Sequence, residues 1–276
     1  MRVAFQGERG AFSESAAQRL LGDAIETVPC HTFEDTFAAV TTADVDCCVA
    51  PIENSLAGSI HRNYDLMLES GLTIAAETHL RISHSLIAPP GVALGSVRTV
   101  LSHPVALAQC TRLFKRHPLL VSTAVHDTAG AVRMVMERGR GDEAAIASHD
   151  AAGLYGAHVL EDEVEDNPRN YTRFLLLAAA ATRLPLREVA QRWKTSIVFR
   201  VANKPGALFR AIGAFALHEI DLAKIESRPI EGRPWEYAFY LDIIGRSNEP
   251  IIAHAIDNLT RMAEMVKVLG SYPTRW

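Results

Sequence analysis

Short apolar stretches alternate with amphipathic ones over roughly the first 180 residues, and this alternation constrains the fold more than any other feature. Residues 2–6, 25–30 and 46–52 are short and apolar, whereas 14–21 and 33–43 have helical periodicity. Strand–helix alternation is typical of a parallel, doubly wound sheet, whose ligands bind beyond the carboxyl ends of the strands. The sequence therefore predicts an α/β fold with its site at those strand ends.

An extended stretch at 72–88 interrupts the alternation, which resumes over 97–155. This pattern indicates that the chain crosses from one lobe to a second and later returns. We expect lobe one to comprise 1–80 and 156–181, and lobe two to comprise 81–155. Ligand sites favour such interfaces, so the cleft between the lobes is the expected site.

A polar stretch at 182–193, which includes Pro185, is predicted to be a linker after a two-lobed domain at 1–181. Residues 194–276 then follow the order strand, helix, strand, strand, helix, strand. That order predicts a ferredoxin-like βαββαβ domain. Because so small a sheet leaves edges exposed, we expect a homodimer or homotetramer.

Composition excludes several classes of protein. A formal net charge of -4 without a Lys/Arg run argues against a nucleic-acid partner. No apolar run is long enough to span a bilayer, which argues against a membrane protein. A glycine at residue 7 comes too early for a signal peptide, so we expect a cytoplasmic protein.

The first strand leads into the loop Gly7–Ser13 and then into a helix. Ser13 is a suitable N-cap, and the free N–H groups of a helix start attract anions. Gly7 and Gly10 lack the spacing of a dinucleotide-binding loop, and no lysine follows as in a P-loop. A carboxylate is therefore the expected ligand.

Polar residues stand at the ends of three other predicted strands. Ordinary structural roles remain open for these residues. The alternatives are a helix-capping turn at 53–55, a structural hydrogen bond from His103, and an N-cap at Asp127. A further candidate, Gln109, falls inside a helix predicted at 105–117. The strand-end residues are Glu53, Asn54 and Ser55 after one strand, Ser102 and His103 after a second, and Asp127 and Thr128 after a third.

The stretch 170–174 runs directly into the apolar residues 175–181. A hydroxyl at Thr172 and a guanidinium at Arg173, placed just before a buried strand, are suited to meet an anionic ligand. The alternative is that 167–170 form a turn and that Thr172 merely begins a strand.

Seven segments carry a resemblance to a known family: 7–13, 51–55, 102–104 with Gln109, 127–131, 172–174, 206–209 and 226–229. Together they resemble the prephenate dehydratase family followed by a regulatory ACT domain. The resemblance implies a two-lobed fold similar to a type II periplasmic binding protein, with the active site in the cleft. It also implies a carbon–oxygen lyase of phenylalanine biosynthesis that converts prephenate to phenylpyruvate, water and carbon dioxide without metal or organic cofactor. Because no chorismate mutase segment precedes Met1, the chain resembles the monofunctional form.

The resemblance also implies roles for individual residues. Thr172 would hydrogen-bond the leaving hydroxyl as a polarised donor, and Arg173 would bind a carboxylate or orient Thr172. Glu53 beside a dianion needs a partner and could be structural. The catalytic set is Thr172, Arg173, Asn54, Gln109 and Ser102. The substrate-binding set is Ala11, Phe12, Ser13, Glu53, Ser55, His103, Asp127, Thr128 and Phe174.

For the tail, the resemblance implies phenylalanine as an effector bound between two subunits. Gly206 would let the backbone approach the ligand, and Glu226 would take its ammonium group. The alternative is a simple turn at 203–206 and a solvated Glu226. The predicted effector residues are Gly206, Ala207, Leu208, Phe209, Glu226, Ser227, Arg228 and Pro229.

Two other functions remain open. Residues 58–65 and 269–273 also resemble plant arogenate dehydratases, which perform the same chemistry on the aminated substrate. A non-catalytic amino-acid sensor with a binding-protein-like cleft is the alternative from another class, although a donor set for a leaving hydroxyl argues against it.

Overall fold

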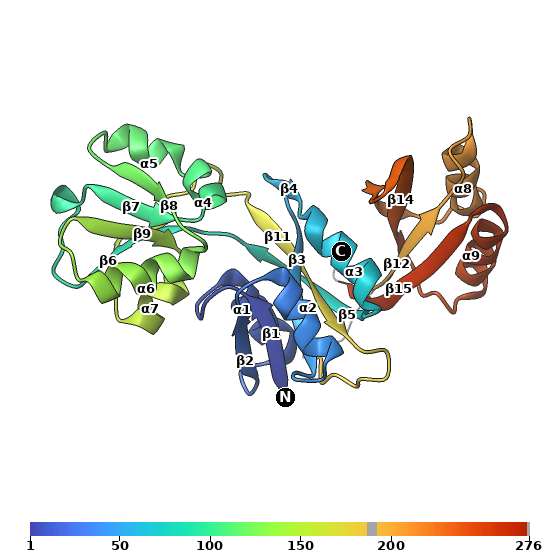
Figure 1. The fold of residues 1–276 in the computed structure, drawn as a ribbon, viewed down its shortest axis with the longest axis horizontal. Helices are drawn as coiled ribbons and strands as arrows, with labels where there is room; N and C mark the ends of the chain where they lie inside the picture. The colour runs from blue at the N-terminus through green and yellow to red at the C-terminus, as the bar shows by residue number, and fades with distance from the viewer. Residues whose placement is uncertain (187–191, 275–276) are drawn as a thin grey trace.

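The computed structural model describes residues 1–186 and 192–274, which build three sheets arranged along the long axis of the molecule (Figure 1). The central sheet has the order β2-β1-β3-β11-β5, with β4 paired to β3. The second sheet is β10-β6-β9-β7-β8, and the third is β13-β14-β12-β15. The two-lobed α/β architecture with a C-terminal βαββαβ domain is thus confirmed.

Most predicted strands form within a few residues of their expected ends. In the first two sheets the strands are β1 Arg2–Gln6, β2 Glu26–Cys30, β3 Cys47–Asn54, β4 Gly58–Ser59, β5 Thr73–Arg81, β6 Ser85–Ala88, β7 Thr99–Ser102, β8 Val121–Ala124, β9 Glu143–Ala147, β10 His158–Glu161 and β11 Tyr171–Ala178. In the third sheet they are β12 Arg192–Arg200, β13 Leu222–Ile230, β14 Arg233–Ile244 and β15 Met265–Thr274.

Helices alternate with strands through much of the first two sheets, but β4 directly follows β3, β6 directly follows β5, and α4 and α5 both follow β7. They are α1 Phe12–Leu21, α2 Phe33–Thr41, α3 His61–Ser70, α4 Pro104–Ala108, α5 Thr111–Arg116, α6 Thr128–Arg138, α7 His149–Tyr155, α8 Ala207–Ala216 and α9 Pro250–Met262, with a 3-10 turn at Leu94–Ser96. No helix within 1–186 and 192–274 is long and apolar enough to cross a membrane.

β11 is the element that brings the distant parts of the site together. It lies between β3 and β5 and runs antiparallel to both, so the central sheet is mixed rather than purely parallel. Its register places Thr172 opposite Asn54. Thr172 therefore lies within the strand and not in the loop before it, and strand alternation decides which way its side chain points.

The chain crosses between the lobes twice, from β5 to β6 and from β10 to β11. β10 pairs with β6 in the second sheet, although residues 156–181 were expected to return directly to lobe one. The chain re-enters the central sheet only at Tyr171. Antiparallel pairing of β10 with β6 explains the difference, because it completes an edge of the second sheet.

Two sequence expectations about helix ends are corrected. Ser13 is not the N-cap of α1; Ala11 occupies that position and makes no side-chain capping bond. The helix expected at 105–117 divides into α4 and α5, and Gln109 lies at the break as the C-cap of α4. Asp127, by contrast, is the N-cap of α6 as predicted, accepting a hydrogen bond from the Gly130 amide.

The C-terminal domain uses both faces of its sheet. Helices α8 and α9 pack on one face around Phe199, Phe215 and Leu241. The other face joins a core shared with lobe one, where Tyr240 and Tyr272 pack with residues of α3 and β5. Besides its own core beneath α8 and α9, the C-terminal domain therefore shares a second apolar core with lobe one.

Gly270 marks the closest approach between these domains. A Cβ added there would lie 2.3 Å from the Ile74 carbonyl oxygen of β5. No side chain fits at such a distance, so the contact between β15 and β5 requires glycine.

Candidate active site

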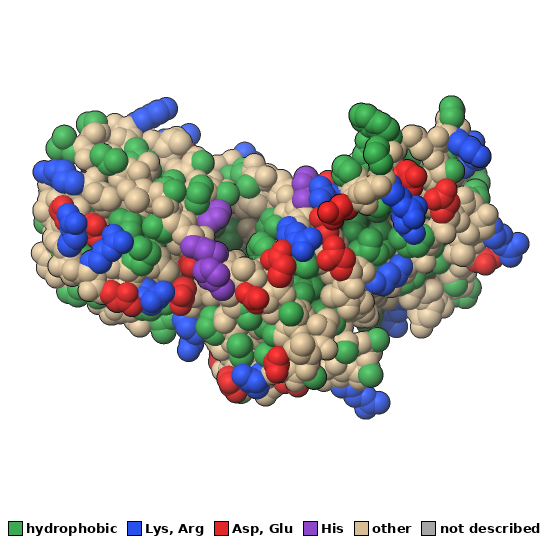
Figure 2. Space-filling view, in the orientation of Figure 1, with side chains coloured by type: hydrophobic (Ala, Val, Ile, Leu, Met, Phe, Trp, Pro, Cys, Tyr) green, Lys and Arg blue, Asp and Glu red, His purple; other side chains and the backbone are tan. Residues whose placement is uncertain are grey.

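A cleft of about 700 Å³ separates the two lobes. Lobe one lines it with the carboxyl ends of β1 and β3 and the start of α1, and lobe two contributes α4 and the start of α6. Figure 2 shows the hollow at the centre of the molecule with histidine side chains beside it. The cleft thus lies where the strand-end argument expected a ligand.

Asn54 and Thr172 form the central contact of the cleft. The Asn54 Nδ2 group donates to Thr172 Oγ1 at 2.9 Å and to Asn170 Oδ1 at 2.7 Å. The backbone N–H groups of Leu56 and Ala57 donate to Asn54 Oδ1 at 2.9 and 2.8 Å, which fixes the amide orientation. Thr172 Oγ1 therefore accepts from Asn54, and its own proton remains to be donated into the cleft.

Asn170 extends this network to the second lobe. The Asn170 side chain is fully buried, and its Nδ2 group donates to Gln109 Oε1 at 2.9 Å. Since the oxygen of Gln109 is the acceptor in this bond, its NH₂ group is the part available to a ligand. The break between α4 and α5 places Gln109 where it can make this contact.

His84 completes the network from the crossing segment between β5 and β6. Its Nε2 lies 3.3 Å from Gln109 Oε1, which can only accept, so Nε2 carries the proton. Burial lowers the pKa of His84, which keeps the ring neutral, and Nδ1 is a buried acceptor without a partner among the described residues. The ring also packs edge-on against Phe12 at 5.7 Å between centroids.

The start of α1 offers a second kind of donor. The helix has no side-chain cap, so the backbone N–H groups of Phe12 and Ser13 face the cleft without a capping partner. Glu14 in the first turn is occupied by Arg9, Thr27 and the Gly10 amide. The uncapped helix start is therefore suited to a carboxylate.

Ten of the predicted site residues line the cleft: Ala11, Phe12, Ser13, Asn54, His103, Gln109, Asp127, Thr128, Thr172 and Phe174. Sequence reasoning missed His31, Ser59, His84 and His126, which also line it, and Asn170, which supports it. Asn170 stood beside the motif 172–174, but no spacing distinguished the other four.

Four predicted residues do not line the cleft. Ser102 is fully buried and donates to the Ile146 carbonyl at 2.6 Å. Ser55 bonds the backbone of Arg169 and Tyr171. Arg173 and Glu53 point towards the C-terminal domain, because residues that alternate along a strand face opposite sides of the sheet.

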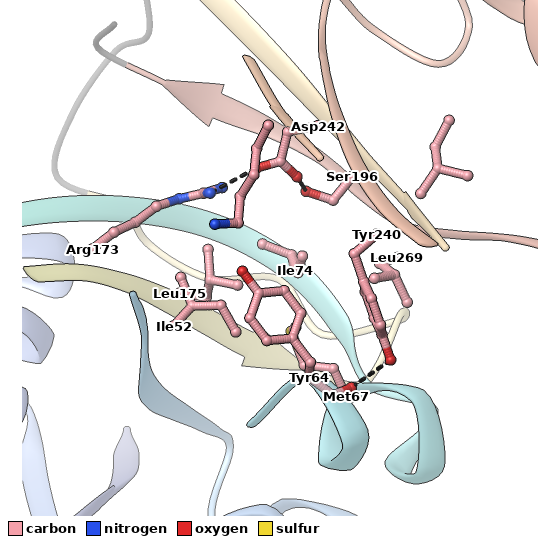
Figure 3. A pocket seen from close by; sticks show the side chains of 12 residues that line it. Ile52, Tyr64, Met67, Ile74, Arg173, Leu175, Ser196, Tyr240, Asp242 and Leu269 are labelled. Carbon is pink, nitrogen blue, oxygen red and sulfur yellow. Dashed lines mark hydrogen bonds and ion pairs between the residues drawn. The ribbon is translucent and has the colours of Figure 1, made fainter. Parts of the chain in front are cut away.

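Arg173 is the centre of a buried ionic cluster between the domains. Its guanidinium contacts Glu77 at 2.7 Å, Asp242 at 2.6 Å and the Tyr272 hydroxyl at 2.9 Å, and its side chain is 5% exposed. Figure 3 shows Arg173 bonded to Asp242 above a cavity of about 10 Å³. Burial would raise the pKa of Glu77, but Arg173 and Lys194 outweigh it and lower the pKa.

The predicted effector residues divide between the two faces of the C-terminal sheet. Gly206 has a φ of 77° and begins α8, with Ala207 to Phe209 following in the first turn. Ser227 and Pro229 are exposed on β13.

Glu226 and Arg228 point towards lobe one instead. Glu226 accepts from Ser59 Oγ at 2.5 Å and lies 3.3 Å from His61 Nε2, while Arg228 pairs with Asp65 at 2.9 Å. Glu226 therefore contacts the loop that lines the cleft, not the start of α8.

Comparison with known proteins identifies the family to which this chain belongs. The model of the family "Prephenate dehydratase" matches residues 3–182, and that of the ACT domain matches 195–260. The chain belongs to the prephenate dehydratase family.

Arogenate dehydratase/prephenate dehydratase 2 of Arabidopsis thaliana, a chloroplastic protein, is 44% identical over 99% of this chain and 73% of that protein. The structure of an Arthrobacter aurescens prephenate dehydratase in complex with L-Phe has a TM-score of 0.89 at 30% identity, covering 99% of this chain and 90% of that one. GqqA, described as a quorum quenching acylase, has a TM-score of 0.89 at 36% identity, covering 100% and 98%.

Proposed function

We propose that the cleft catalyses the decarboxylating dehydration of prephenate to phenylpyruvate, water and carbon dioxide. The observation that carries the proposal is the Asn54–Thr172 hydrogen bond, in which Thr172 Oγ1 accepts, so that its own proton is available to a ligand in the cleft. Membership of the prephenate dehydratase family supports the same reaction.

In this reaction the bond between the ring and its carboxylate breaks, and the electron pair moves into the ring as the ring C–O bond breaks. Carbon dioxide departs, and the departing hydroxyl takes a proton to leave as water. Aromatisation provides the driving force, so the enzyme needs chiefly to hold the carboxylates and stabilise the charge that develops on the leaving oxygen.

Thr172 stabilises that charge in the proposed mechanism. A threonine hydroxyl is too weak an acid to titrate, but a hydroxyl that already accepts a hydrogen bond is a better donor. The amide of Asn54 supplies that bond, and Asn170 holds the amide in place. Gln109 directs its NH₂ group to the same ligand, and the start of α1 binds a carboxylate.

The structure does not favour Thr172 as a nucleophile, which is the role that an acyl transfer through its hydroxyl would require. Such a reaction requires a base that accepts the hydroxyl proton. Within the described part of the chain, the side-chain partner of Thr172 Oγ1 is an amide that donates to it.

Arogenate dehydration is the second candidate, and one feature of the cleft and one comparison favour it. The lining includes the carboxylates of Glu34 and Asp127, which could attract an ammonium group. Several relatives are named arogenate dehydratases, among them one of Petunia hybrida that is 43% identical.

Spectroscopy distinguishes the candidates. Phenylpyruvate formation from prephenate and phenylalanine formation from arogenate are measured in parallel with the same protein. A higher kcat/KM for prephenate supports the proposal, a higher value for arogenate changes the substrate, and turnover of neither leaves the sensor alternative.

The C-terminal domain is proposed to bind phenylalanine between two subunits and to reduce activity. An L-Phe complex of a relative supports the effector. Phe209, Leu217 and Trp235 are 82%, 85% and 76% exposed in a single chain, which supports burial by a second copy. Light scattering with and without phenylalanine tests the homodimer or homotetramer.

The domain boundaries belong to the same proposal: a catalytic domain at 1–181, a linker at 182–193 and a regulatory domain at 194–276. Residues 187–191 of this linker lie outside the described residues. The cytoplasmic location and the independence from metal and cofactor stay predictions.

A further inference from the structure

The cleft meets an anionic substrate without a permanently charged cation. Among the described residues that line it, none is lysine or arginine, whereas four are histidine: His31, His84, His103 and His126. A dianion that leaves water needs a compensating charge or hydrogen bonds. The histidines are therefore the lining side chains that can supply positive charge.

Two of the four histidines are already used as neutral rings. His84 donates to Gln109, and burial lowers its pKa. His103 Nδ1 accepts from the Val105 amide at 3.2 Å, and burial followed by the nearby His126 lowers its pKa. Neither ring is suited to carry the charge.

His31 and His126 remain, and they come from opposite lobes. His31 follows β2 in lobe one, and His126 follows β8 in lobe two. Their rings lie 4.4 Å apart between centroids at 45°, and both are exposed at the edge of the cleft. Neither ring nitrogen has a hydrogen-bond partner among the described residues, so both are available to a ligand.

The charged groups around the pair are acidic. Asp127 and Glu34 line the same part of the cleft, and both are engaged elsewhere, Asp127 as the cap of α6 and Glu34 with Arg62 at 2.7 Å. Asp35, in the first turn of α2, forms a capping box with Thr32, the residue after His31. The opposing group is the ring of His103, which is neutral. Two charged imidazoles would repel each other, and an anion bound by nitrogens of both rings would offset that repulsion.

We infer that His31 and His126 form a carboxylate subsite at the mouth of the cleft, one histidine from each lobe, which favours a dianionic substrate and bridges the two lobes. This inference rests on the proposed function, since it assumes a substrate with two carboxylates. It also favours prephenate over arogenate, whose ammonium group would meet the same imidazolium.

The test measures KM and kcat for prephenate between pH 6.0 and 8.5. In the wild type, KM is expected to rise with pH, because a charged imidazole binds a carboxylate more strongly than a neutral one does. His31→Gln and His126→Gln should raise KM at pH 6.0 by about five- to tenfold and flatten the profile, from one charge pair at about 4 Å. The effect should fall on KM rather than on kcat.

A lysine at position 31 tests whether the positive charge of the side chain, rather than the shape of the imidazole ring, lowers KM. His31→Lys keeps a cation at every pH of the series, so KM should stay low up to pH 8.5. The matched control is His158→Gln, an exposed histidine on β10 outside the cleft lining, which should retain the wild-type profile. For arogenate, the glutamine variants should raise KM by less than for prephenate.

Calorimetry in a Thr172→Ala background measures the Kd for prephenate without turnover. The effect of the two histidines on binding is thereby measured separately from any effect on the reaction. Loss of the pH dependence of Kd in both glutamine variants supports the subsite, whatever the turnover. An unchanged Kd profile in both, or no prephenate binding by the Thr172→Ala protein, would overturn it. Turnover of neither substrate together with pH-dependent binding would count against the proposed function alone.

Discussion

Thr172 and Arg173 are neighbours on β11, yet their side chains face opposite sides of the central sheet. Thr172 lines the cleft between the lobes, and Arg173 is buried against Asp242 of the C-terminal domain. One strand therefore carries a catalytic candidate on one face and the main interdomain ion pair on the other. Any shift of the C-terminal domain that moves Arg173 acts directly on the strand that positions Thr172.

Removing the Thr172 hydroxyl should abolish most catalysis while leaving binding intact. Thr172→Ala is expected to lower kcat by about 10²–10³, as for the loss of one donor to a developing oxyanion. Thr172→Ser keeps a hydroxyl beside Asn54 and should lose far less. The rate of phenylpyruvate formation checks both, and an alanine variant as fast as the wild type would exclude Thr172 from the mechanism.

His84 should act as a positioning residue through Gln109. His84→Phe keeps the ring packed against Phe12 but removes the donor to Gln109 Oε1, and kcat should fall about tenfold, the effect of one hydrogen bond of about 1.5 kcal/mol. His84→Gln restores a donor near the Nε2 position and should recover most of the rate. Equal loss in both variants, at equal melting temperature, would indicate a packing role only.

The fold was largely predictable because its hydrophobic periodicity is strong. The exception at α4 and α5 has a local cause, since the break at Gln109 serves a contact with Asn170 from far along the chain. The cleft residues contributed by strand ends, such as Asn54 and Asp127, were predictable for the same reason.

The sequence could not indicate which of two neighbours faces the cleft. Arg173 has the chemistry of an anion site, but β11 begins before it and strand alternation turns it away. Its partner Asp242 lies in another domain, so no local pattern could reveal the pair. His31 and His126 meet only because two lobes close on each other.

Breaking the interdomain ionic cluster should destabilise the protein strongly. Arg173→Met leaves Glu77 and Asp242 buried with one cation fewer, and the free energy of unfolding should fall by about 3–5 kcal/mol. Urea unfolding followed by circular dichroism measures this. The control is Arg261→Met, which removes an exposed pair with Asp257 within α9 and should cost about 0.5 kcal/mol. Equal losses would show that the buried cluster adds nothing.

Stability should fall in acid because of His79. Burial lowers the pKa of His79 to about 4, from an ordinary value of 6.5. Below about pH 6.5 the unfolded chain binds a proton that the folded chain does not, so stability present at pH 7 is lost as the pH falls towards 4. His79→Gln should flatten the unfolding free energy over pH 6.5–4.5, whereas His158→Gln should not. An unchanged slope in His79→Gln would place the acid sensitivity elsewhere.

Glu226 should transmit the effector signal to the cleft. Its carboxylate accepts from Ser59, which lines the cleft, while Ser227 next to it on β13 faces the opposite side of the sheet. Glu226→Gln weakens the link to Ser59, His61 and Lys224, so phenylalanine should still bind but inhibit several-fold less. Binding is measured by calorimetry and inhibition by the prephenate assay, with Glu231→Gln in the exposed turn after β13 as control. Glu226→Gln with full inhibition would leave the Arg173 cluster as the route between the domains, whereas loss of phenylalanine binding itself would place Glu226 in the effector site.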